Sequence, residues 1–100
     1  MILYDIMLTI DDSIHDEWLE WMKSKHMPKI MKTGCFTEGK MYRVLTPEPE
    51  DGTSYSVHFY CRSLEDYERY QIKHAALLQA EQKEKFGSKF AVYRSVMEKA

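Results

Sequence analysis

The stretch Ile-Leu-Tyr-Asp-Ile-Met-Leu-Thr-Ile at residues 2–10 places an apolar side chain at every second position. This period of two predicts a β-strand with one apolar face, because successive side chains of a strand point to opposite faces of its sheet. β-branched and aromatic residues favour strands and are frequent in the run. The sequence therefore predicts a first strand that lies centrally in its sheet.

A helix is predicted directly after this strand. Residues 11–13 are Asp-Asp-Ser, which are good helix N-caps, and the acidic Asp16 and Glu17 suit the positive end of the helix dipole. Apolar residues then recur at helical spacing, which is typical of an amphipathic helix on a core. We expect the helix to end near Met27, because Pro28 disfavours helical geometry at the preceding residue.

Two strands are predicted next, at residues 36–45 and 53–61. The segment between them, residues 46–52, contains two prolines and an Asp-Gly pair and reads as a turn. Two strands joined by so short a connection form an antiparallel hairpin.

A second helix should begin after Ser63, which resembles the first residue of a capping box, and end at Gly87. One stripe of this helix carries Leu64, Tyr67, Tyr70, Gln71, His74, Leu77 and Leu78. A last strand is predicted over residues 89–97. The order βαββαβ predicts an α+β, ferredoxin-like fold as a single domain over residues 1–100, with two helices on one face of a four-stranded antiparallel sheet.

The composition argues against several classes of function. The 100 residues carry a net charge of -2, so no positive field is present to bind nucleic acid. No segment is apolar enough to span a membrane, and the N-terminus lacks the basic region of a secretory signal. Cys35 and Cys61 lack CxxC spacing; a bridge between them is possible, but reduced thiols in the cytoplasm are the favoured interpretation.

Two motifs resemble a known superfamily. The first helix contains Trp-Leu-Glu-Trp-Met at residues 18–22 and continues to His-Met-Pro at residues 26–28. A serine-led helix follows the strand that ends at Cys61 and carries His74. With these motifs the whole chain resembles the dimeric α+β-barrel superfamily, whose ferredoxin-like members include relatives of the antibiotic-biosynthesis monooxygenases.

The chain is also similar to a family of small bacterial proteins known only as a domain of unknown function. The shared segments are DDSIHDEWLEWMK at residues 11–23 and EKFGSKF at residues 84–90. The superfamily resemblance implies a homodimer in which two sheets pack together. It implies no particular activity, because the members of the superfamily include oxygenases, isomerases, haem-degrading enzymes and proteins without a known reaction.

The sheet face that the helices leave bare supports the dimer independently. Its expected residues are Leu3, Met7, Tyr60, Ala91, Tyr93 and Met97. A largely apolar surface of this kind indicates a partner, and a two-fold arrangement is the commonest way to bury it.

His26 and His74 are the candidate catalytic residues. His26 lies at the edge of the apolar helix face, where it is either a base or ligand contact or a group that caps helix carbonyls. His74 lies in the tyrosine stripe and either lines the same cavity or packs in the core. The residues expected to contact a ligand are Trp18, Met22, His26, His58, Tyr67, Tyr70 and His74.

No spacing typical of a metal site or of a nucleotide-binding loop is present, so no cofactor is predicted. Arg43 and Arg94 interrupt apolar strand faces, and either is a candidate partner for Asp5. The favoured interpretation is a cytoplasmic homodimer that binds a small molecule between sheet and helices, in a cavity of several hundred Å³. The alternatives are a cofactor-independent monooxygenase-like or isomerase-like enzyme with His26 or His74 as base, and a structural dimerisation module.

Overall fold

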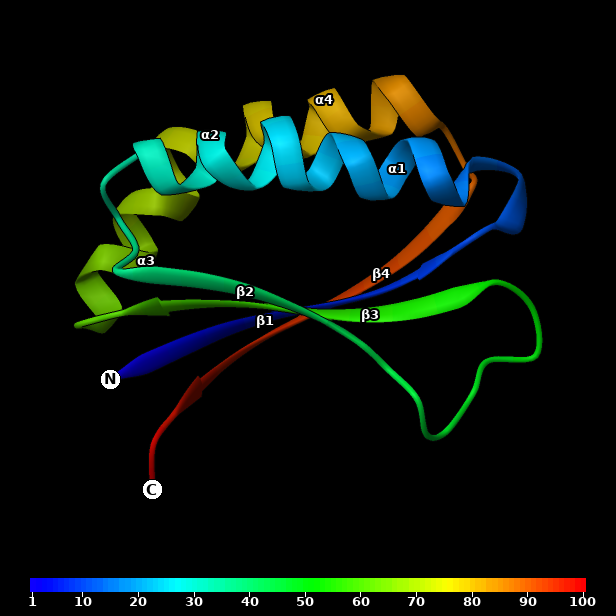
Figure 1. Ribbon diagram of the computed structural model, residues 1–100. Helices are drawn as coiled ribbons and strands as arrows, with labels where there is room; N and C mark the ends of the chain where they lie inside the picture. Colours follow the sequence, from blue (N-terminus) through cyan, green and yellow to red (C-terminus); the bar gives the residue numbers. More distant parts are fainter.

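The computed structural model describes residues 1–100 and forms one antiparallel sheet with two long helices on one side (Figure 1). The strands are β1 (Ile2–Ile10), β2 (Glu38–Arg43), β3 (Thr53–Cys61) and β4 (Phe90–Glu98). Their order in the sheet is β2-β3-β1-β4, and each neighbouring pair is antiparallel. The prediction that residues 2–10 form a central strand is confirmed.

Each long helix consists of α-helical segments with a π-helical segment in the middle. The first comprises the 3₁₀ turn η1 (Asp12–Ile14), α1 (His15–Trp21), the π segment η2 (Met22–His26) and α2 (Met27–Lys32). The second comprises α3 (Leu64–Tyr70), the π segment η3 (Gln71–Ala75) and α4 (Ala76–Phe86). The chain therefore has the predicted βαββαβ order of a ferredoxin-like fold. No helix combines the length and the apolar character needed to cross a bilayer.

The predicted helix signals act as expected. The Asp11 carboxylate accepts a hydrogen bond from the Ser13 N–H at 2.9 Å, and the Ser63 hydroxyl accepts one from the Asp66 N–H at 3.3 Å. Gly87 ends the second helix with a φ of +61°, a conformation that side chains with a Cβ rarely adopt.

The prediction that the first helix ends near Met27 is wrong, because the helix continues to Lys32. In η2 the Met27 N–H donates to the carbonyl of Met22, five residues back, instead of four. This wider turn interrupts the regular hydrogen-bond ladder ahead of Pro28, which then stands in the first turn of α2. A proline is tolerated there, because the first turn has no need of its missing N–H.

The second π segment changes which residues of the second helix face the sheet. Tyr70 and Ala75 are both buried although they lie five positions apart, and burial then continues at Leu78, Gln82 and Phe86. Leu77, which the predicted stripe included, is 69% exposed. The π turn adds about one residue to the helical period, and this moves the buried stripe along the helix.

The second strand is shorter than the predicted range 36–45. Phe36 precedes it and is buried under the helices, where its ring lies 4.9 Å from that of Tyr70. The prediction of the third strand as residues 53–61 is confirmed.

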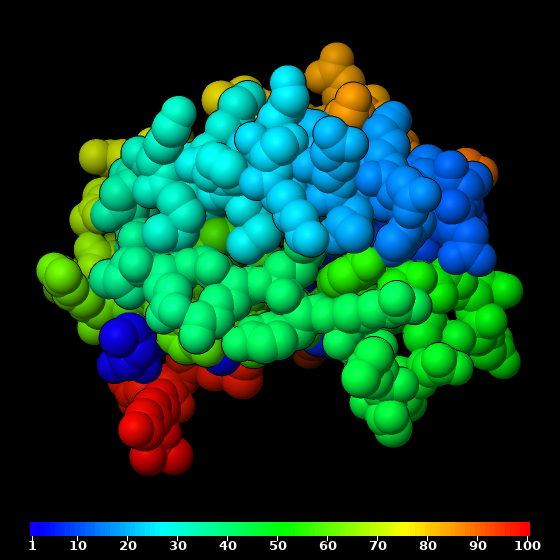
Figure 2. Space-filling view, in the orientation of Figure 1, coloured from blue at the N-terminus to red at the C-terminus, as the bar shows by residue number.

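The core lies between the sheet and the helices, and the opposite face of the sheet carries no covering layer (Figure 1). The space-filling view shows the helices closing over one side of the sheet (Figure 2). On the other side the molecule is hollowed between the C-terminal residues and the connection from β2 to β3 (Figure 2).

The shifted stripe predicts a difference between two adjacent leucines. Leu78→Ala should lower the free energy of unfolding by about 2–5 kcal/mol, because Leu78 is buried, whereas Leu77→Ala should change it by less than about 0.5 kcal/mol. Urea unfolding of the two variants measures both values. An equal loss of unfolding free energy in the two variants would contradict the burial of Leu78 and the exposure of Leu77.

Candidate functional site

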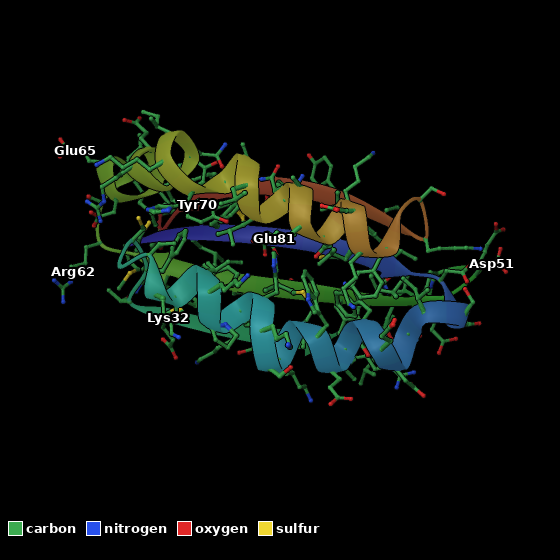
Figure 3. All side chains as sticks on the ribbon, turned by 90° about the horizontal axis from the view of Figure 1, so that it is seen from above. Lys32, Asp51, Arg62, Glu65, Tyr70 and Glu81 are labelled. Atoms are coloured by element: carbon green, nitrogen blue, oxygen red, sulfur yellow. The ribbon has the colours of Figure 1, made fainter.

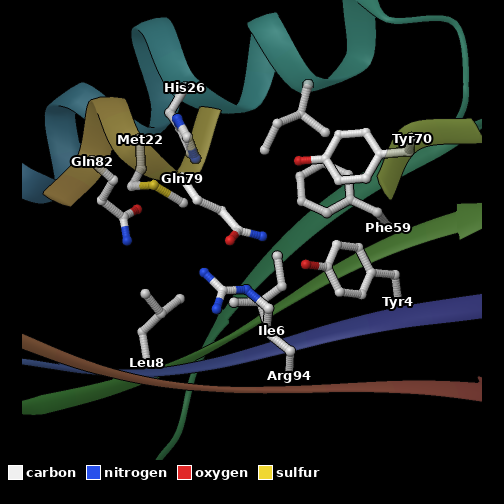
Figure 4. Close-up of a pocket in the computed structure, with 11 residues that line it drawn as sticks. Tyr4, Ile6, Leu8, Met22, His26, Phe59, Tyr70, Gln79, Gln82 and Arg94 are labelled. Carbon is white, nitrogen blue, oxygen red and sulfur yellow. The ribbon is translucent and has the colours of Figure 1, made fainter. Parts of the chain in front are cut away.

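A small cavity lies between the inner face of the sheet and both long helices (Figure 4). Its volume of about 20 Å³ leaves room for one water molecule, far less than the several hundred Å³ expected from the sequence. Apolar side chains form part of the wall. The polar residues that line it are Tyr4, His26, Tyr70, Gln79, Gln82 and Arg94.

Three of these polar residues are more than nine-tenths buried. Tyr70 is 2% exposed, Gln82 5% and His26 7%. Among their polar atoms, the His26 Nδ1 atom is fully buried and has no hydrogen-bond partner. The other two such atoms of the chain, Trp18 Nε1 and His58 Nδ1, lie outside the cavity. Buried polar groups are almost always paired in proteins, so the unpaired His26 Nδ1 atom in a cavity with a partly polar lining identifies this cavity as the candidate site.

His26 is held as a neutral imidazole. Burial lowers its pKa from 6.5 to about 4, although the charge of Glu81 acts in the opposite direction. Its ring stacks on that of Trp21, with centroids 4.5 Å apart and planes inclined by 21°. A neutral imidazole offers one N–H donor and one nitrogen acceptor to a ligand, and at a pKa near 4 it is a weak base.

The two phenols of the cavity remain protonated. Burial raises the pKa of Tyr70, and burial also raises the pKa of Tyr4 against the opposing effect of the Arg94 guanidinium. Both hydroxyls point toward the cavity from the same end (Figure 4). They therefore supply neutral O–H groups that can donate or accept hydrogen bonds.

Arg94 reaches the cavity from the edge strand β4. It lies opposite Ile6 in the register and projects from the inner face, with its guanidinium beside Gln79 (Figure 4).

The expectation that Arg94 or Arg43 pairs with Asp5 is wrong. Asp5 lies opposite Ser95 on the outer face and accepts a hydrogen bond from the Ser56 hydroxyl at 2.8 Å.

An ion pair joins the two long helices near the cavity. The Lys29 Nζ atom lies 3.0 Å and 3.3 Å from the two carboxylate oxygens of Glu81. The view from above places Glu81 between the helices (Figure 3). The pair engages the carboxylate whose charge acts on His26, and Arg94 forms no ion pair in the chain.

The structure brings together three of the residues expected to contact a ligand: Met22, His26 and Tyr70 line the cavity. Trp18, His58, Tyr67 and His74 do not line it. The Trp18 ring is buried against Tyr55, the Tyr67 ring packs on the edge of Tyr4, and the His74 ring lies 6.3 Å from that of Tyr70 outside the cavity. His58 lies on the opposite face of the sheet.

Four polar lining residues were not among the expected contacts: Tyr4, Gln79, Gln82 and Arg94. The alternation of side chains in the first strand already indicated that Tyr4 lies on the inner face of the sheet. Gln82 lies four residues after Leu78, so regular helical spacing continues the predicted stripe to it, but the expected contacts on this helix ended at His74.

His58 belongs to a separate polar cluster on the bare face. Its Nε2 atom lies 2.8 Å from the Ser56 hydroxyl and 3.5 Å from the Asp5 carboxylate. In the register, Ser95 and Lys40 extend this cluster into a polar row across the sheet. The cluster and the cavity lie on opposite faces and cannot act on the same ligand atom.

No group of three or more metal-ligating side chains converges in the structure, so we assign no metal site.

A model of the family described as a domain of unknown function, DUF4286, matches residues 1–100. The chain belongs to the DUF4286 family. No curated protein matches its sequence.

Solved structures share the fold of this DUF4286 chain. A dimeric ferredoxin-like protein from an uncultured marine organism has a TM-score of 0.73 at 14% identity, over 100% of this chain and 95% of that one. An ethyl tert-butyl ether D (EthD) family protein from Bacillus halodurans has a TM-score of 0.66 at 14% identity, over 100% of both chains. A monooxygenase from Streptomyces coelicolor, in complex with nanaomycin D, has a TM-score of 0.58 at 13% identity, over 99% and 88%. At these identities the similarity shows the fold alone.

The buried histidine of this DUF4286 protein predicts a loss of stability in acid. Between pH 6.5 and about 4 the unfolded chain binds a proton at His26 that the folded chain excludes, so folding should lose up to roughly 3 kcal/mol as the pH falls. His26→Phe should remove this contribution and keep the stacking on Trp21. Thermal unfolding against pH measures it, with His74→Phe as the control outside the cavity. An unchanged acid dependence in His26→Phe would contradict the assignment.

Proposed function

We propose that this protein binds a small organic molecule in the cavity between sheet and helices, and that it does so as a homodimer packed through the bare face of the sheet. The observation that carries the proposal is the fully buried, unpaired Nδ1 atom of His26, in a cavity that the buried residues Tyr70 and Gln82 also line. A buried polar group costs about 1–3 kcal/mol when it lacks a partner. A fold that needed only to be stable would gain by replacing this histidine with an apolar residue.

Access to the cavity is controlled by Arg94. Its side chain is exposed, forms no ion pair and stands on an edge strand, so to rotate away it gives up its contact with the Tyr4 hydroxyl and no ion pair. With Arg94 inside, the cavity holds about one water molecule. Withdrawal of the long side chain to the mouth of the cavity makes room for a small ligand, whose polar atoms would then pair with the buried groups.

The π segments support a role in binding. η2 supplies Met22 and His26 to the cavity, and η3 begins directly after Tyr70. π turns are rare and are frequent at functional sites. Both helices therefore depart from regular geometry at the level of the same cavity.

The dimer is supported by the bare face of the sheet. Tyr93 is 71% exposed there, and Leu3, Met7 and Met97 share that face. The hollow in this surface can receive a second copy (Figure 2). The marine ferredoxin-like relatives are described as dimeric. Cys35 and Cys61 are unbridged, which is consistent with a reducing compartment such as the cytoplasm.

A second candidate function is catalysis in the same cavity, of the cofactor-independent monooxygenase or isomerase type, with His26 as base. The unpaired Nδ1 atom favours it, since a base needs a free lone pair. The lowered pKa opposes it, because a base with a pKa near 4 provides little driving force at neutral pH. We therefore place binding before catalysis.

Native mass spectrometry of freshly purified protein tests the binding proposal. We expect an added mass on the dimer, and we expect Gln79→Trp to abolish it by filling the cavity. Gln71→Trp, at an exposed position of the same long helix, should retain the added mass. A bare dimer from cells grown on several carbon sources would contradict binding and favour a purely structural dimerisation module.

Sedimentation at micromolar concentration tests the dimer. The wild type should sediment as a dimer and Tyr93→Asp as a monomer, because the new charge would be buried without a partner between the sheets. Ile72→Asp provides the matched control, since Ile72 is an exposed apolar residue on the helix side. A monomeric wild type, or a dimeric Tyr93→Asp protein, would contradict packing through the sheets.

A further inference from the structure

We propose that the ligand of the sheet–helix cavity is a monocarboxylate with a compact aromatic body, whose acid group pairs with Arg94. The inference rests on the proposed binding function and names the ligand class of that same site.

The charge of the lining is the first argument. Arg94 is the one charged side chain among the eleven lining residues, because His26 is neutral and the other polar members are tyrosines and glutamines. No aspartate or glutamate lines the cavity. The site therefore carries a single positive charge and attracts a single negative one.

The surroundings of Arg94 leave its guanidinium without an acid from this chain. The same face of β4 carries Val92 and Val96 on either side, and Ile6 lies opposite in the register. Glu81 is engaged by Lys29, and Asp5 lies on the other face. A guanidinium presents parallel N–H groups whose spacing matches a carboxylate, and such charge-assisted pairs are the strong hydrogen bonds of proteins.

The remaining walls define the body of the ligand. Rings of Tyr4, Phe59 and Tyr70 line the cavity with aliphatic side chains between them. Aromatic walls of this kind suit a flat apolar ring, which stacks or packs edge-on against them. The Gln82 amide and the His26 imidazole provide hydrogen bonds for a polar ring substituent.

Benzoate and benzamide are suitable probes, because they have the same shape and differ in charge. Isothermal titration of the full chain at pH 7 should show that benzoate binds at least about tenfold more tightly than benzamide, the difference expected for a charge-assisted pair. Arg94→Gln should lose this preference and retain the weak affinity for benzamide. Arg43→Gln, which removes a cation from β2 outside the cavity, should keep the wild-type preference.

The outcomes separate the two proposals. Equal affinity of the wild type for both probes, or an unchanged preference in Arg94→Gln, would overturn the acid ligand and leave binding in the cavity intact. Failure of both probes to bind, together with a bare dimer in native mass spectrometry, would overturn both proposals. Melting curves of the two arginine variants show whether each variant is folded. If a variant is unfolded, the ratio of the benzoate and benzamide affinities of the wild type still tests the inference.

Discussion

The pairing of β1 with both β3 and β4 determines which strand side chains face the cavity and which face the bare side of the sheet. Ile6 stands between Val57 and Arg94, so these three side chains share the inner face. Asp5, one position earlier, stands between His58 and Ser95 on the outer face. Because side chains alternate along a strand, a slip of one residue in β4 would remove Arg94 from the cavity and place Tyr93 there. The cavity and the bare face are thus two consequences of one register.

The fold could be predicted from the sequence because its signals are local. Alternation in residues 2–10, the caps at Asp11 and Ser63, and the stop at Gly87 each depend on a few neighbouring residues. The π segments could not be predicted, since they follow from the packing of whole helices on the sheet and have no residue signature. Their consequence is the extension of the first helix past Pro28 and the shifted stripe of the second.

The site was predicted less completely for the same physical reasons. Met22 and His26 lie four apart on the first helix and were found from helical spacing, as was Tyr70, which precedes the π segment η3. Gln82 continues the same stripe four residues after Leu78, but a polar side chain at that spacing does not by itself indicate burial. The sequence showed that Arg94 interrupts an apolar strand face. Whether Arg94 and Asp5 lie on the same face of the sheet depends on the register between β1 and β4, which lie far apart in the sequence.

The central claim is that the buried His26 Nδ1 atom lacks a partner in the chain because the cavity that it shares with Tyr70 and Gln82 binds something else. A crystal structure at atomic resolution, determined from protein as purified, tests this most directly. We predict density in the cavity, from ordered water or a retained molecule, within hydrogen-bond distance of the His26 Nδ1 atom and of the Tyr70 hydroxyl or the Gln82 amide. A dry cavity closed by these side chains bonding to one another would contradict the account.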